Sequence, residues 1–156
     1  MRNENVMFLR VFHFVKMISQ MGKGVLSFLF PSFRVLRSTG GSTSARYCYS
    51  VFMRHRVLLE AHGGLKMPKV VAEIGPGDSI GVGLAALIAG AERYYGFDVM
   101  AYSIPALEQQ IFEELVELFA KEEPIPGEEE FPSIKPRLDS YAFPSHIFSK
   151  AYLKEV

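Results

Sequence analysis

The stretch Lys69–Val99, KVVAEIGPGDSIGVGLAALIAGAERYYGFDV, decides the fold. Its first part, residues 70–74, is short, almost entirely apolar and rich in β-branched residues, which is typical of a strand buried on both faces of a parallel sheet. Residues 79–90 then repeat small and apolar residues at helical spacing. Asp78 or Ser79 is placed to cap this helix.

A second short run, residues 94–97, predicts another strand, which ends at Asp98. With the crossover helix between them, the two strands form a parallel β-α-β unit of about the minimal length. In the turn after the first strand, Gly75 and Gly77 can adopt positive φ and bring bare backbone against a ligand, near the positive end of the helix. Asp98 follows the neighbouring strand, where a carboxylate can accept both hydroxyls of a ribose. The unit therefore predicts a nucleoside site.

The spacing of the turn residues separates two kinds of nucleotide site. A dinucleotide fingerprint has the pattern G-x-G-x-x-G preceded by an apolar residue. Here Gly81 comes one residue late, and the acidic Glu73 stands two places before Gly75. The motif E-I-G-P-G-D-S, followed by Y-G-F-D, resembles the cofactor-binding motif of class I S-adenosylmethionine-dependent methyltransferases. That family often has a further glycine where this chain has Ser79.

The resemblance implies a fold, an activity and a set of site residues. The fold would be α/β, a Rossmann-like parallel sheet of the class I methyltransferase type, of which the chain holds only the N-terminal part, preceded by helices. The activity would be methyl transfer from S-adenosyl-L-methionine to an unidentified acceptor. Glu73 would lie near the amino group of the cofactor's methionine part, and Asp98 would hold the ribose. The other cofactor-binding residues would be those of the turn: Gly75, Pro76, Gly77, Asp78 and Ser79.

Other functions fit the same residues. An NAD(P)-binding oxidoreductase fragment and a non-catalytic nucleoside-binding or interaction module are the alternatives, because a fold does not fix a function. The single Cys48 allows no internal disulfide and no cysteine zinc site, so we expect a cytoplasmic, reducing environment and no metal. The resembled fold has seven strands, whereas two are convincing here. We therefore expect a longer natural protein, and no catalytic residue can be assigned.

The charge is distributed unevenly along the chain. Residues 1–69 contain 11 Lys and Arg against 2 Asp and Glu, and the remaining residues contain 6 against 15. Within the N-terminal segment, residues 1–40, polar and mostly basic residues recur every three or four positions over residues 6–30, opposite a wide apolar face. They are Arg10, His13, Lys16, Gln20 and Lys23. This pattern fits an interfacial helix on an anionic membrane or, as we favour, a helix that packs on the domain, residues 41–156. Contact with nucleic acid is not expected, because no aromatic-basic motif accompanies the charge.

A helix should precede the first strand, from about Ala45 to His62, and end at a Gly-Gly pair. Its cap should be supplied by Ser42, Thr43 or Ser44. The apolar residues expected to face inward are Cys48, Val51, Phe52, Leu58 and Leu59. The short basic cluster on this helix, interpreted as a solvated face, consists of Arg54, His55 and Arg56.

The core unit, residues 69–121, should close with an amphipathic helix that begins near Ser103-Ile104-Pro105. Its glutamates are interpreted as a solvated face rather than as catalytic acids or bases. Five prolines in residues 122–146 predict an ordered loop without a long element. A terminal helix is expected over residues 147–156. His146 is interpreted as a helix-start residue, with a role as catalytic base as the alternative.

Overall fold

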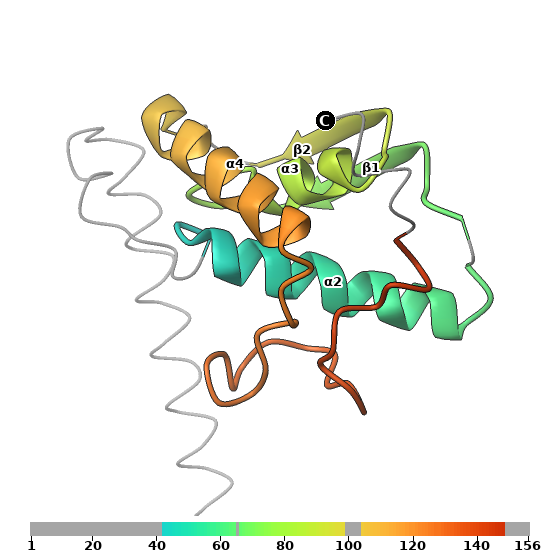
Figure 1. The fold of residues 1–156 in the computed structure, drawn as a ribbon. Helices are drawn as coiled ribbons and strands as arrows, with labels where there is room; N and C mark the ends of the chain where they lie inside the picture. Colours follow the sequence, from blue (N-terminus) through green and yellow to red (C-terminus); the bar gives the residue numbers. More distant parts are fainter. Residues whose placement is uncertain (1–41, 65, 99–103, 149–156) are drawn as a thin grey trace, which may run out of the picture. The chain divides into compact units, whose positions relative to one another are not determined.

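The computed structural model describes residues 42–64, 66–98 and 104–148, all within the unit Thr39–Val156. In chain order the elements are α2 (Ala45–Ala61), β1 (Val70–Ile74), α3 (Gly81–Ile88), β2 (Arg93–Phe97) and α4 (Pro105–Ala120) (Figure 1). This order confirms the predicted β-α-β-α unit and the helix before it. The helix predicted over residues 6–30 and most of the terminal helix lie outside the described residues. The last described residues, 145–148, form a turn.

The sheet has one covered face and one open face. β1 and β2 pair in parallel, with Val71 opposite Tyr94. On the helix side, Val71 and Tyr94 are partly buried. On the other side, large apolar side chains are 45, 91, 46 and 59% exposed, in the order Val70, Ile74, Tyr95 and Phe97. The prediction that the first strand is buried on both faces is therefore wrong, because no described element covers the second face.

Helix α2 begins and ends where the sequence predicts. Ser44 is the N-cap, and its hydroxyl accepts a hydrogen bond from the N–H of Tyr47 at 3.4 Å. His62 is the C-cap, and Gly63 follows at φ +89°. Two predictions about its faces are wrong: Leu58 and Leu59 are exposed, and the supposedly solvated cluster is largely buried.

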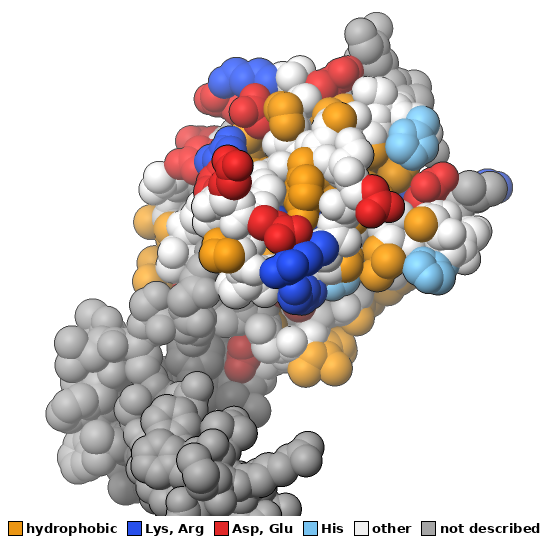
Figure 2. Space-filling model, turned by 90° about the horizontal axis from the view of Figure 1, so that it is seen from below, with side chains coloured by type: hydrophobic (Ala, Val, Ile, Leu, Met, Phe, Trp, Pro, Cys, Tyr) orange, Lys and Arg blue, Asp and Glu red, His pale blue; other side chains and the backbone are white. Residues whose placement is uncertain are grey.

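The reason lies in the layers on either side of α2. The sheet lies on one side of this helix, and the Pro-rich segment, residues 121–148, crosses the other side (Figure 1). Arg54 and Arg56 are consequently 0 and 4% exposed. On the molecular face seen in Figure 2, acidic and basic side chains are interspersed rather than separated by sign. The predicted basic cluster of α2 is therefore not a surface patch.

Helix α3 starts two residues later than predicted, and its first residue, Gly81, lies against α2. Its N-cap is Ile80, which makes no side-chain cap bond, and the hydroxyl of Ser79 accepts the N–H of Gly81 at 3.2 Å. A Cβ on Gly81 would lie 2.5 Å from Sγ of Cys48 and 2.9 Å from Cγ2 of Ile111. Glycine at this position thus lets α3 approach both α2 and α4.

Helix α4 confirms the predicted amphipathic pattern. Its buried residues Ile111, Leu115 and Phe119 contribute to the core, together with side chains of α2 and α3. The glutamates at the exposed positions are Glu113, Glu114 and Glu117, whereas Glu108 is partly buried. The N-cap is Ile104 without a side-chain bond, and the proposed cap Ser103 lies outside the described residues.

Candidate functional site

The glycine-rich turn lies at the carboxyl end of β1, as predicted. Gly75 and Gly77 have φ values of +73° and +78°, in the region that favours glycine. The N–H of Gly75 donates to the carbonyl of Phe97 at 2.7 Å, which fixes the start of the turn to the end of β2. A Cβ on Gly75 would meet nothing within 4 Å, so the conformation and not crowding requires glycine here.

Asp98 lies directly beside this turn. Its Oδ2 accepts a hydrogen bond from the N–H of Gly77 at 3.3 Å, although the two residues are 21 positions apart. The carboxylate is exposed to solvent. The structure thus brings together three of the predicted site residues: Gly75, Gly77 and Asp98.

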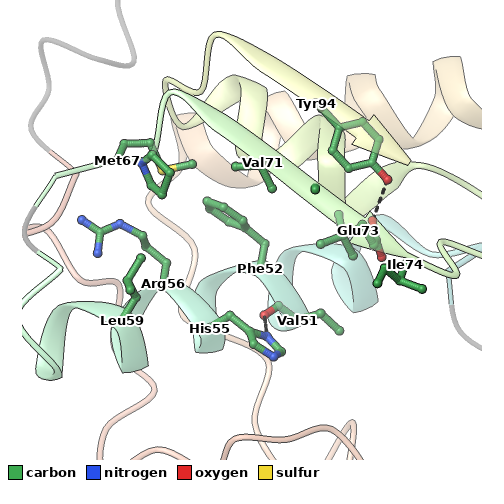
Figure 3. Close-up of a pocket in the computed structure, with 13 residues that line it drawn as sticks. Val51, Phe52, His55, Arg56, Leu59, Met67, Val71, Glu73, Ile74 and Tyr94 are labelled. Carbon is green, nitrogen blue, oxygen red and sulfur yellow. Dashed lines mark hydrogen bonds between the residues drawn. The ribbon is translucent and has the colours of Figure 1, made fainter. Parts of the chain in front are cut away.

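Glu73 has a different environment. It lies on the helix side of β1, where its Oε2 accepts a hydrogen bond from the hydroxyl of Tyr94 at 2.7 Å (Figure 3). Burial raises the pKa of the Glu73 carboxyl, and the bond from Tyr94 opposes that shift. Burial, followed by the same hydrogen bond, also raises the pKa of Tyr94, so the phenol remains a donor. Sequence reasoning missed Tyr94 as a partner of Glu73.

The last two turn residues, Asp78 and Ser79, are held by the chain that precedes α2. The N–H of Asp78 donates to Oγ of Ser42 at 2.9 Å, and the hydroxyl of Ser79 donates to the carbonyl of Ser42. Asp78 and Ser79 are 8 and 2% exposed. The amide of Asp78, one of the residues that the resemblance assigns to cofactor binding, is therefore engaged within the protein. Ser79 acts in packing the turn against α2, and sequence reasoning did not anticipate Ser42 in this role.

Cys48 completes the buried contact below the turn. Its Sγ lies 3.5 Å from the carbonyl of Ser42 and 4.0 Å from Oγ of Ser79. Burial raises the pKa of the Cys48 thiol to about 12. A thiol with such a pKa stays protonated near neutral pH and is a poor nucleophile. This confirms the interpretation of Cys48 as a buried helix residue.

His146 does not belong to this site. Its Nε2 lies 3.7 Å from a carboxylate oxygen of Glu60, in the last turn of α2. Cys48, which contacts the glycine-rich turn region, lies twelve residues earlier on the same helix, a separation of about 18 Å along the helix axis. The structure therefore gives no support for His146 as a catalytic base at the turn.

Comparisons with known proteins found no similar family model, curated protein or solved structure. Within residues 42–64, 66–98 and 104–148, no helix is long and apolar enough to cross a membrane. The same part of the chain contains no group of three or more His, Cys, Asp or Glu side chains that could hold a metal ion. Function is therefore inferred from the geometry of the turn and its neighbours.

Proposed function

We propose that the glycine-rich turn and Asp98 bind S-adenosyl-L-methionine, as the cofactor-binding part of a methyltransferase whose acceptor is not identified. The observation that supports this proposal most strongly is the 3.3 Å hydrogen bond from Gly77 N–H to Asp98 Oδ2. It joins backbone at positive φ to a carboxylate at the end of the adjacent parallel strand. Nucleoside sites of α/β sheets use this combination at the carboxyl ends of the strands.

Three properties of the residues present support the proposal of this cofactor. The surroundings of Gly75 are open, so a ligand can approach the backbone of the turn. Asp98 is exposed and can accept ribose hydroxyls. A protonated amine beside Glu73 would favour the ionised carboxylate and offset the effect of burial on its pKa. The amides of Gly75, Gly77 and Asp78 all donate within the protein, so the turn would contribute close approach of bare glycine backbone rather than free N–H donors.

The chain's own residues would act by positioning. When bound, the cofactor supplies an electrophilic methyl group on its sulfonium centre. Asp98 would fix the ribose, and Glu73 would fix the amino group at the other end. Holding both ends restricts the direction in which the methyl group faces the acceptor, and such orientation is a large source of rate enhancement.

Calorimetric titration with S-adenosylhomocysteine and, separately, with NAD tests the proposal on the wild type, on Asp98→Asn and on the control Asp139→Asn. Asp139 is exposed and lies in the Pro-rich segment. Loss of a charged hydrogen-bond acceptor should weaken S-adenosylhomocysteine by about 1.5–3 kcal/mol, roughly 10-fold to 150-fold. The control should bind like the wild type. Binding of NAD alone would support the oxidoreductase alternative, and binding of neither ligand by the folded chain would contradict the proposal.

A further inference from the structure

A groove of about 420 Å³ lies between β1 and α2 (Figure 3). Val71 and Glu73 point to the helix side of the sheet, whereas Ala72 and Ile74 point to the open side, yet all four residues line the groove. A groove that runs along the edge of a strand is bordered by residues of both orientations. The groove therefore opens at the outer edge of β1, away from β2.

The backbone at this edge is available for another strand. The carbonyl of Lys69 and the N–H of Gly75, at the two ends of β1, both bond toward β2. Since backbone groups alternate along a strand, Val70, Ala72 and Ile74 direct their N–H and C=O groups outward. In the described part of the chain, β2 is the strand that pairs with β1, in a sheet of two. An open edge of this kind is a template for strand addition.

The residues that line the groove also determine which side chains an occupant can place there. Its lining is mostly apolar, with Phe52 of α2 and Val82 of α3 among the residues, and α2 also contributes the basic side chains of His55 and Arg56. Glu73 is the acidic residue of the lining and lies at the carboxyl end of β1, with His55 on α2 below it (Figure 3). An occupant that places a cation beside Glu73 would complement this charge in a partly buried position.

We propose that the groove binds an extended polypeptide segment, which adds to β1 as a strand and places apolar side chains on α2 and a Lys or Arg beside Glu73. Strand addition combines main-chain hydrogen bonds with pockets for alternate side chains, and both features are present here.

Fluorescence anisotropy with a labelled synthetic peptide tests this inference on the full chain without cofactor. The probe alternates valine and threonine and carries one lysine at a terminal valine position. Two further probes are N-methylated. One carries the methyl groups on all threonines and the other on all valines and the lysine, so that each probe has one edge of the peptide strand blocked. One of the two should bind at least about tenfold more weakly than the parent, and the other should bind similarly. Equal binding by all three would overturn strand addition.

A matched pair of protein variants locates the binding. Leu59 lines the groove and is 42% exposed, whereas its neighbour Leu58 is 41% exposed and does not line it. Leu59→Asp should weaken the parent peptide at least about tenfold, and Leu58→Asp should not. Equal weakening by both variants, or no binding by a folded wild type, would overturn the proposal. Neither leucine is among the residues proposed to hold the cofactor, so these variants test peptide binding independently of S-adenosylhomocysteine binding. Glu73 is shared by the two proposals, so the cofactor's amine and the peptide's cation would be alternative partners of its carboxylate.

Discussion

The irregular Pro-rich segment of this protein is better buried than its regular sheet. Ile125 and Ile134 of the segment are 2 and 6% exposed, whereas Ile74 and Phe97 of the strands are 91 and 59% exposed. Parallel strands usually form the centre of an α/β domain, with helices on both faces. Here the described helices cover one face. Regular backbone hydrogen bonding therefore does not decide which parts of this molecule are buried.

Helix α2 supplies hydrogen bonds to buried carbonyls of the Pro-rich segment. Arg54 is fully buried, and its Nη1 and Nη2 donate to the carbonyls of Ile134 and Pro126 at 2.7 and 2.8 Å. The hydroxyl of Ser50 donates to the same carbonyl of Pro126 at 2.8 Å. The guanidinium carbon also lies 5.0 Å from the ring centroid of Tyr141. Buried carbonyls require such partners, and the planar guanidinium can serve several of them.

The largest effect is expected from Arg54→Met, which removes both donors: the buried carbonyl of Ile134 loses its bond from Arg54, and that of Pro126 keeps only the bond from Ser50. Each hydrogen bond from a charged group contributes about 1.5–3 kcal/mol, so the free energy of unfolding should fall by about 3–5 kcal/mol. Urea unfolding followed by circular dichroism measures this change. Arg54→Lys keeps the charge but lacks the planar guanidinium, so its free energy of unfolding should lie between those of the wild type and Arg54→Met. If Arg54→Met were as stable as the wild type, the segment would be held by its apolar contacts alone.

A second experiment applies one chemical change to both regions. Ile125→Ala should lower the free energy of unfolding by about 2–4 kcal/mol, because it leaves a cavity in the core. Ile74→Ala removes the same atoms from an exposed strand position and should change it by less than about 0.5 kcal/mol. The comparison of buried segment and open sheet predicts this order. Equal losses would mean that the open face of the sheet is covered in solution.

The order and approximate limits of the elements could be predicted because they depend on local patterns. The cap at Ser44 and the glycine at position 63 fixed α2 to within one residue of the expected end. The buried faces could not be predicted in the same way. Arg54 reads as a surface residue until its partners, 72 and 80 positions further along the chain, are known. Contacts between residues far apart in the sequence therefore determine which faces are buried, and the local pattern does not reveal these contacts.

The candidate site also contains some residues whose roles could be predicted from the sequence and others whose roles could not. Gly75, Gly77 and Asp98 were predictable because a minimal β-α-β unit brings the ends of its two strands together. The contact of Glu73 with Tyr94 depends on the strand register and on which face the helices cover. The bonds of Ser42 to the turn, 36 and 37 positions later, have no signal in the sequence, because serine at this place reads as a helix cap.

The smallest effect concerns Glu73 on the covered face of the sheet, where burial raises the pKa of the carboxyl. The folded state then binds more protons than the unfolded state above the ordinary value of about 4.3, so stability falls as pH rises through the raised pKa. Glu73→Gln keeps an acceptor for Tyr94 without the charge, and should gain stability relative to the wild type from pH 4 toward pH 7, as measured by urea unfolding at each pH. Glu117→Gln is the control of opposite sign, because Lys121 lowers the pKa of Glu117 on an exposed surface, where any trend should be weak. If the stability of the wild type instead rose relative to that of Glu73→Gln as pH rises, the carboxylate would be stabilised in the folded state. His55 would then be the nearby cationic candidate.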